Sequence, residues 1–451
     1  MKISAVLHSQ YGLEVTDKSG DMRVLYHTFG CKANQYDTER MRQELEALGA
    51  LTVNSDSPSD VCVVNTCTVT NAADADARRF IRRIRRERPD IRVIVTGCSA
   101  ALRAEDYKTM NEVEAVVAGY NPVELAKKVV DGKGGLVQLG IKKGLGKLDI
   151  ESVGKSLLTR REGATRGWLK IQDGCDRNCS FCATRLARGK SRSRFPEDVI
   201  REAAILAKSH PELVITGIHI GHYGRDLADP LTLSGLLAQL LEQVPDVRFR
   251  LGSIEATEVD DLLLQLISSS KGRLAPHLHM PLQSGSDPVL RRMRRWYTRE
   301  NYRARAFEIS SKLSRLGLGG DLITGFPGET DSDHQATVRM IEELPYTYIH
   351  VFPFSPKKGT EAVNLPDPVT QRVAGERSRE IRMLVQEKGL RYRSSRSGES
   401  AEVTLESEGS MALTGDYMRV IAKGSIGPDL FRLHKGHLRG LGKDLYIEID
   451  N

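Results

Sequence analysis

The feature that most restricts the fold of this chain is a repeated alternation of short apolar segments with longer amphipathic ones. Between residues 160 and 356 the alternation occurs six times, and the apolar segments have the length of buried β-strands. The predicted strands are 167–175, 212–221, 247–256, 274–285, 318–328 and 347–356, and the main helices are 196–208, 231–243, 258–269, 287–315 and 331–343. Six βα units predict an α/β partial parallel barrel, short of the eight units that close one.

A shorter alternation of the same kind precedes this barrel. It predicts a small parallel sheet with helices on both faces, with strands at 23–31, 60–67 and 92–98 and helices at 35–48 and 77–89. Each strand ends on a cysteine, namely Cys31, Cys67 and Cys98. Because the carboxyl ends of parallel strands gather along one edge where ligands bind, we expect these cysteines to converge. The alternative for each is a buried structural cysteine, which is the role expected for Cys62 within its apolar strand.

The remaining segments complete a chain too long, at 451 residues, for one ordinary core. Residues 130–160 are rich in glycine and lysine and predict a linker, and residues 1–21 read as a variable leader. After a predicted helix at 368–394, short alternating segments broken by glycine predict a small antiparallel β-barrel. No segment has the length of a membrane span or the apolar core of a signal peptide, so we expect a cytoplasmic protein and no membrane partner.

A second set of cysteines follows the first strand of the barrel, in the sequence "GCDRNCSFC" at 174–182. Cys175, Cys179 and Cys182 have the spacing C-x3-C-x2-C. Seven cysteines spread over a long chain argue against a disulfide framework and for metal or redox chemistry. Structural zinc requires four closed ligands, whereas a four-iron cluster held by three cysteines keeps one iron open, as a catalytic cluster requires.

Positive charge is clustered along the chain, which has a formal net charge of +7. The basic runs lie at 77–89, 184–194 and 290–306. Each run alone is compatible with a solvated helix face, but three of them favour a polyanionic partner such as RNA. Trp296, Tyr297 and Tyr302 lie in the third run, where they either stack on bases or pack internally.

The cysteine spacing, with an aromatic residue before the last cysteine and a partial barrel around it, resembles the radical S-adenosylmethionine superfamily. The resemblance implies that Cys175, Cys179 and Cys182 hold a 4Fe-4S cluster. It also implies that S-adenosyl-L-methionine completes the open iron and is cleaved to a radical that removes hydrogen from an unactivated carbon.

The chain from about residue 22 to 450 further resembles the methylthiotransferases, whose last domain is called TRAM. The phrases that carry this likeness are "HLHMPLQSGSDPVLRRMRRWYT" (277–298), "DLITGFPGET" (321–330) and "FPFSPKKGTEA" (352–362). The implied domains are an N-terminal methylthiotransferase domain at 22–135, a radical core at 160–385 and TRAM at 386–451. The resemblance also implies a second 4Fe-4S cluster on Cys31, Cys67 and Cys98, with an open iron that carries the sulfur to be delivered.

The implied substrate is N6-threonylcarbamoyladenosine next to the anticodon of tRNA, methylthiolated at C2 of the adenine. "TFGCKANQYDTE" (28–39) and "VNTCTVTNAADADARR" (64–79) are similar to that branch, although 183–186 read Ala-Thr-Arg-Leu where Ile-Ile-Pro-Tyr is common. The alternatives are N6-isopentenyladenosine in tRNA, an aspartate of ribosomal protein S12, or a non-catalytic iron-sulfur protein that binds RNA.

The resemblance also suggests cofactor contacts and partners. Gly217, Ser253, Glu255 and Gln283 lie near the ends of predicted barrel strands and are candidates to contact S-adenosylmethionine. Such polar side chains can instead satisfy buried backbone groups. The expected partners are the tRNA anticodon stem-loop and a small reductant protein such as flavodoxin or ferredoxin.

Overall fold

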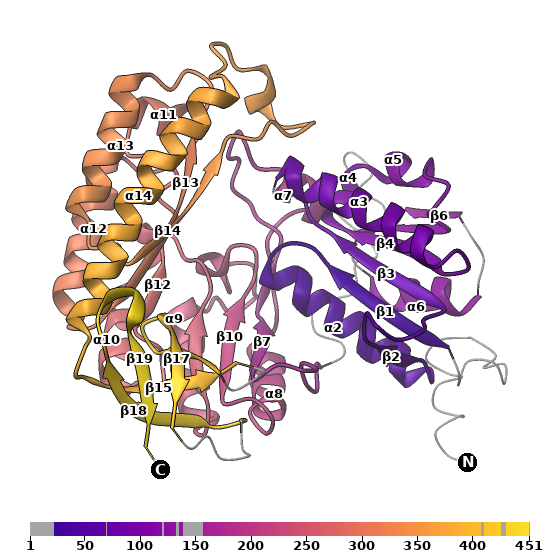
Figure 1. Ribbon diagram of the computed structural model, residues 1–451, viewed down its shortest axis with the longest axis horizontal. Coiled ribbons are helices and arrows are strands. Elements are labelled where there is room, and N and C mark those ends of the chain that lie inside the picture. The colour runs from indigo at the N-terminus through magenta and orange to yellow at the C-terminus, as the bar shows by residue number, and fades with distance from the viewer. Residues whose placement is uncertain are drawn as a thin grey trace. The chain divides into compact units, whose positions relative to one another are not determined.

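The computed structural model describes residues 22–68, 70–119, 121–131, 135–138, 157–406, 410–424 and 430–450 (Figure 1). The chain divides into two compact units. Unit 1 comprises Met1–Leu158, Asp173–Asp176 and Cys182–Lys190, and unit 2 comprises Thr159–Gln172, Arg177–Phe181 and Ser191–Asn451. The predicted leader and most of the predicted linker lie outside the described residues. No helix within the described residues is long and apolar enough to cross a membrane.

Unit 1 contains a parallel sheet of six strands in the order β2-β1-β3-β4-β5-β6. The strands are β1 Arg23–Thr28, β2 Leu51–Val53, β3 Val61–Thr66, β4 Arg92–Gly97, β5 Ala115–Ala118 and β6 Gly135–Gln138. The sequence predicted the small parallel sheet and three of these strands. It missed β2, β5 and β6, which have three or four residues and no alternation of polar and apolar side chains over a longer segment, and β6 lies inside the predicted linker.

Helices cover both faces of this sheet, as predicted (Figure 1). Neighbouring residues of β4 point to opposite faces, so Val95 packs with α3 to α5 and Ile94 packs with α2 and α6. The helices are α2 Lys32–Ala47, α3 Asn71–Glu87, α4 Cys98–Leu102, α5 Ala104–Lys108, α6 Pro122–Asp131 and α7 Thr184–Arg188. Cys62 is fully buried in the first of these two clusters, in agreement with its predicted structural role.

Unit 2 contains six parallel strands in two ladders, β11-β10-β7 and β12-β13-β14. Parallel bridges between Phe249 and Leu274 and between Ser253 and His279 join the ladders, so the order is β7-β10-β11-β12-β13-β14. The strands are β7 Arg166–Lys170, β10 Glu212–Thr216, β11 Arg248–Leu251, β12 His277–His279, β13 Gly317–Thr324 and β14 Tyr348–Pro353. The predicted partial barrel of six units is therefore confirmed.

The helices of unit 2 follow the predicted order with one difference. They are α8 Pro196–Leu206, α9 Leu233–Gln243, α10 Asp261–Ser269, α11 Asp287–Arg292, α12 Arg299–Lys312, α13 Asp331–Glu343 and α14 Gln371–Ser395. The segment 287–315 was predicted as one helix but forms two, α11 and α12. Arg294 adopts a left-handed φ of 56°, which ends the first helix, and Thr298 and Asn301 form a capping box that starts the second.

The C-terminal segment forms a closed five-stranded barrel in the order β15-β16-β17-β19-β18. The strands are β15 Ser400–Leu405, β16 Met411–Thr414, β17 Arg419–Lys423, β18 Leu433–Arg439 and β19 Tyr446–Ile449. The sequence predicted an antiparallel barrel, but β17 and β19 pair in parallel. An odd number of strands cannot alternate in direction all the way around a closed ring, so one parallel pair is required.

A buried ion network connects the two barrels of unit 2. The fully buried carboxylate of Glu212, on β10, accepts hydrogen bonds from Arg248 Nε at 2.7 Å and from Arg250 Nε at 2.8 Å. The same arginines donate to backbone oxygens of the C-terminal segment, Arg248 to Glu402 at 3.1 Å and Arg250 to Gly415 at 2.7 Å. The two guanidinium groups hold the pKa of Glu212 far below its usual value in spite of burial.

Candidate functional site

The structure brings Cys31, Cys67 and Cys98 to one edge of the sheet of unit 1. They follow the carboxyl ends of β1, β3 and β4, which are neighbours in the sheet. Gly30 adopts a φ of +100°, and a Cβ atom on it would lie 2.5 Å from Cys67 Sγ, so only glycine allows this approach. Gly97, with a φ of +95°, gives Cys98 a similar turn. All three cysteines are free thiols, as expected for metal ligands.

Cys98 Sγ lies 3.5 Å from Asn34 Oδ1, and Asn34 is in the first turn of the helix that follows Cys31. Burial raises the pKa of the Cys98 thiol, the charge of Cys31 raises it further, and the charge of Arg188 lowers it. Cys31 is exposed, Cys67 is buried and Cys98 is half-buried, so the group is open to solvent on one side. Convergence at the sheet edge, which the sequence predicted, is thus what the structure contains.

Asn34 fixes the two loops that precede Cys31 and Cys67. Its Nδ2 donates to the carbonyl oxygens of Phe29 at 2.9 Å and Thr66 at 3.0 Å, and the side chain is fully buried in the first turn of α2. The sequence analysis missed this residue. The available signal was a polar residue three positions after a cysteine at the start of an amphipathic helix.

Arg188, at the end of α7, contacts the cysteine group directly. Its Nε donates to Cys98 Sγ at 3.2 Å. Its Nη1 donates to both carboxylate oxygens of Asp173 at 3.1 Å, and its Nη2 donates to Asn34 Oδ1 at 2.5 Å and Asp37 Oδ2 at 2.7 Å. All of these residues belong to unit 1. The arginine therefore lies inside the unit and is not exposed, although the sequence placed it in a basic run for RNA.

The C-x3-C-x2-C segment connects two short elements, β8 Gln172–Asp173 and α7. Cys175 and Cys182 belong to unit 1, and Cys179 belongs to unit 2. The backbone N–H of Cys175 donates to the carbonyl oxygen of Gly189 at 3.1 Å, and the N–H of Thr184 donates to Cys182 Sγ at 3.4 Å. All three side chains are half-buried thiols, the form that can bind a metal cluster.

In unit 2, Cys179 lies next to a buried ion pair. Arg295 Nη1 donates to Cys179 Sγ at 3.3 Å, and Arg295 Nη2 lies 2.5 Å from both oxygens of Glu255. Burial raises the pKa of Glu255 even though Arg295 acts in the opposite direction. Glu255, a predicted cofactor contact, thus holds the arginine that hydrogen-bonds to one of the three thiols.

The other predicted contacts lie at the carboxyl ends of barrel strands, as expected. Gly217 follows β10, and a Cβ atom on it would lie 2.9 Å from the carbonyl oxygen of Gln172, so the backbone passes very close there. Ser253 follows β11 and is exposed. Gln283 follows β12 and is half-buried, with a left-handed φ of 65°. Their contact with S-adenosylmethionine stays a prediction.

A charge cluster that the sequence analysis missed follows β10. His219 Nε2 and His222 Nε2 lie 2.8 and 3.2 Å from Glu258 Oε1, and the two buried imidazole rings stack. Although burial opposes ionisation, hydrogen bonds from the two histidines lower the pKa of Glu258 to about 2. Arg177 lies 3.7 Å from Glu258 and over the ring of Trp296. Glu258 therefore stays an ionised carboxylate among these neighbours.

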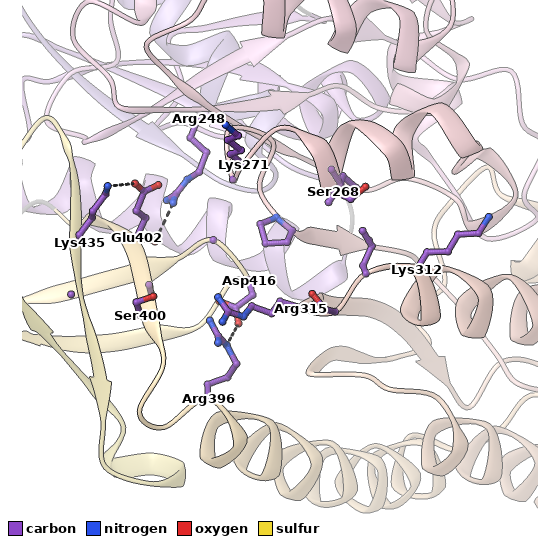
Figure 2. A pocket seen from close by; sticks show the side chains of 18 of the residues that line it. Arg248, Ser268, Lys271, Lys312, Arg315, Arg396, Ser400, Glu402, Asp416 and Lys435 are labelled. Atoms are coloured by element: carbon purple, nitrogen blue, oxygen red, sulfur yellow. Dashed lines mark hydrogen bonds and ion pairs between the residues drawn. The ribbon is translucent and has the colours of Figure 1, made fainter.

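A cavity of about 600 Å³ lies at the opposite ends of the barrel strands (Figure 2). Arg248 and Pro276 line it where β11 and β12 begin, and its other side is the C-terminal barrel. Six basic side chains line it, but several have acidic partners: Arg396 pairs with Asp416 at 2.8 Å, and Lys312 with Asp261 at 3.0 Å. Because it lies at the amino ends of the strands, this cavity of unit 2 is separate from the predicted cofactor contacts, which follow the carboxyl ends of the same strands.

The basic runs are less available to RNA than the sequence suggested. Arg194 is buried and paired with Glu202 at 2.9 Å, and Tyr297 and Tyr302 are buried in the core. In contrast, α3 keeps its apolar side on the sheet and exposes a row of arginines on its outer side. These are Arg79, Arg82, Arg83 and Arg86.

Comparison with known proteins places both units in described families. Residues 23–119 match the family UPF0004, described as uncharacterized, and residues 169–341 match the radical SAM superfamily. Among solved structures, the radical S-adenosylmethionine methyltransferase TsrM of Kitasatospora setae is similar in fold, with a TM-score of 0.53 at 16% identity over 74% of this chain and 75% of that one.

Curated relatives match nearly the whole chain. A threonylcarbamoyladenosine tRNA methylthiotransferase of Bacillus subtilis is 35% identical over 89% of this chain and 90% of its own. One of Thermotoga maritima is 33% identical over 85% and 86%. A tRNA-2-methylthio-N(6)-dimethylallyladenosine synthase of Bacillus subtilis is 30% identical over 90% and 81%. With these similarities and the partial barrel, the chain belongs to the radical S-adenosylmethionine methylthiotransferase family and is an enzyme of that class.

Proposed function

We propose that this enzyme attaches a methylthio group to C2 of N6-threonylcarbamoyladenosine in tRNA. The observation that carries the reaction class is the presence of two separate sets of three cysteine thiols in a radical SAM chain. The choice of substrate is supported by five relatives of that printed activity, which are 31–35% identical over most of this chain. Relatives that act on dimethylallyladenosine make the isopentenyl substrate the second candidate.

Cys175, Cys179 and Cys182 would hold the radical cluster. Three soft thiolates suit a four-iron cluster and would leave one iron open for S-adenosylmethionine. When bound, this pair supplies the radical chemistry that removes hydrogen from an unactivated aromatic carbon. Arg295 donates to the Cys179 thiolate and offsets part of the negative charge that accumulates on a cluster with three thiolates. Gly217, Ser253, Glu255 and Gln283 remain our candidates for positioning the cofactor.

Cys31, Cys67 and Cys98 would hold the second 4Fe-4S cluster. The residues fit such a cluster, because three thiols lie at one edge of the sheet and are open to solvent on one side. Asn34 holds the loops before Cys31 and Cys67, and Arg188 donates to the sulfur of Cys98. A fourth ligand from the protein is not required, because a site that delivers sulfur needs an open position. When bound, this cluster supplies the sulfur that becomes the methylthio group.

We propose the tRNA anticodon stem-loop as the partner, with the exposed arginines of α3 and the C-terminal barrel, in the role of a TRAM domain, as contact surfaces. A flavodoxin or ferredoxin in the cytoplasm would provide the electron.

A substrate panel tests this proposal. The reconstituted enzyme is incubated without oxygen with a reductant, S-adenosylmethionine and one substrate at a time: stem-loops carrying the threonylcarbamoyl or the isopentenyl group, or ribosomal protein S12. We expect a mass gain of one methylthio group on the threonylcarbamoyl stem-loop only. Product on the isopentenyl stem-loop or on S12 alone would contradict the assigned substrate.

A further inference from the structure

We propose that Arg188 is a positioning residue that raises the reduction potential of the cluster held by Cys31, Cys67 and Cys98, through its hydrogen bond to Cys98 Sγ. The inference rests on the proposed assignment of that second cluster. It concerns one arginine of the basic run 184–194, one of three runs that together favoured RNA as a partner.

Every donor of Arg188 has a partner inside unit 1. A guanidinium group has five N–H donors in a fixed planar fork. The Nε–H group donates to Cys98 Sγ, and Nη1 donates to the carboxylate oxygens of Asp173. Nη2 donates to Asn34 Oδ1 and Asp37 Oδ2. The residue is buried, so no donor remains for a phosphate. Its charge therefore acts on the sulfur site and not on RNA.

Arg188 contacts the sulfur atom of Cys98 and not only the carboxylates around it. Asp37 and Asp173 are sufficient to neutralise the guanidinium, yet the Nε–H is directed at the sulfur. A hydrogen bond and a positive charge on a ligand sulfur withdraw electron density from the cluster and favour its reduced, more negative state. The contact should thus raise the potential of this cluster relative to the same cluster without it.

Asp173 and Arg188 lie on either side of the C-x3-C-x2-C motif in the sequence. Asp173 lies two residues before Cys175, and Arg188 lies six residues after Cys182. Both ends of the segment that carries the C-x3-C-x2-C motif therefore meet at the guanidinium group, which also contacts Cys98. The charge on Asp173 opposes that of Arg188, so the two residues should shift the potential in opposite directions.

The test uses the full-length chain in which Cys175, Cys179 and Cys182 are changed to alanine, so that only the second cluster can form. Its reduction is followed by electron paramagnetic resonance during a redox titration. We expect Arg188→Gln to shift the reduction equilibrium about tenfold towards the oxidised form, the effect of losing one charge-assisted hydrogen bond, which is about 59 mV for one electron. Asp173→Asn, which keeps the arginine and an acceptor oxygen, should shift it in the opposite direction.

Arg42→Gln is the matched control, because Arg42 is also a buried, ion-paired arginine of unit 1 but pairs with Glu39 and Glu46 on α2. It should leave the potential unchanged. An unchanged potential in both Arg188→Gln and Asp173→Asn would overturn the inference, as would shifts of the same sign. If Arg188→Gln retains no cluster, Asp173→Asn decides alone. A parent chain that binds no iron would instead refute the proposed second cluster, so the two failures are distinguishable.

Discussion

Replacement of Glu212 by glutamine should destabilise unit 2 more than any exposed substitution. Glu212 is the only acidic side chain hydrogen-bonded, among the described residues, to both Arg248 and Arg250, at 2.7 to 2.9 Å. Glutamine has nearly the same volume, but it carries no charge, and its NH2 group would face donors. The two guanidinium groups would then remain buried with their charge uncompensated.

The magnitude follows from that burial. Removing one partner of a buried ion pair costs about 3–5 kcal/mol, a large part of the total stability of about 5–15 kcal/mol that a domain has. With an m value of about 3 kcal/mol per molar urea, the unfolding midpoint should fall by about 1–2 M. The same arginines hold the oxygens of Glu402 and Gly415, so the C-terminal barrel should loosen together with the parallel strands.

Tryptophan fluorescence during urea unfolding measures this directly, because the only two tryptophans, Trp168 and Trp296, both belong to unit 2. Glu387→Gln is the control, since Glu387 forms an exposed pair with Arg391 that contributes about 0–1 kcal/mol. A midpoint for Glu212→Gln within the range of this control would refute the reasoning, because it would mean that the buried arginines do not depend on Glu212 for their charge compensation.

Two further predictions concern the cysteine edge and pH. Gly30→Ala should reduce the iron bound at the second site, because the added Cβ would collide with Cys67 Sγ. Metal analysis measures the bound iron, and Cys62→Ala is the control that should retain full iron content. Equal iron in both variants would contradict the geometry. Burial lowers the pKa of His210 to about 4, so His210 takes up a proton at higher pH in the unfolded chain than in the folded one. The contribution of neutral His210 to the free energy of unfolding should therefore be fully present above pH 6.5 and should fall by roughly 3 kcal/mol as the pH drops to 4. His210→Asn should flatten this dependence in urea titrations, and an unchanged slope would exclude His210 as its source.

The sequence predicted the parts of the fold that depend on local pattern. Strands within longer apolar or alternating segments, their alternation with helices and the cysteines at the ends of three of them are all visible in short windows. Strand β5 consists of four small apolar residues, AVVA, without the polar and apolar alternation of β11 and β12, and the break at Arg294 depends on one left-handed residue. The parallel pair β17–β19 follows from closure of the ring, which no local pattern contains.

The contacts around the cysteines could not be predicted for a different reason. Arg188 is 90 residues from Cys98 and 154 from Asn34 along the chain, and its own segment reads as a basic surface run. Arg194 was misread in the same way, since its partner Glu202 lies one helix further on. Whether an arginine is exposed to RNA or paired with a buried carboxylate depends on tertiary packing, which cannot be read from the residues next to it in the sequence.

The two cysteine sets are proposed to have different roles in one reaction, one in forming the radical and the other in delivering the sulfur. The most direct measurement quantifies 5′-deoxyadenosine and methylthiolated nucleoside in the same anaerobic reaction for Cys98→Ala and Cys179→Ala. The account predicts that Cys98→Ala still forms 5′-deoxyadenosine but no methylthiolated product, and that Cys179→Ala forms neither. Methylthiolated product from Cys98→Ala, or 5′-deoxyadenosine from Cys179→Ala, would contradict it.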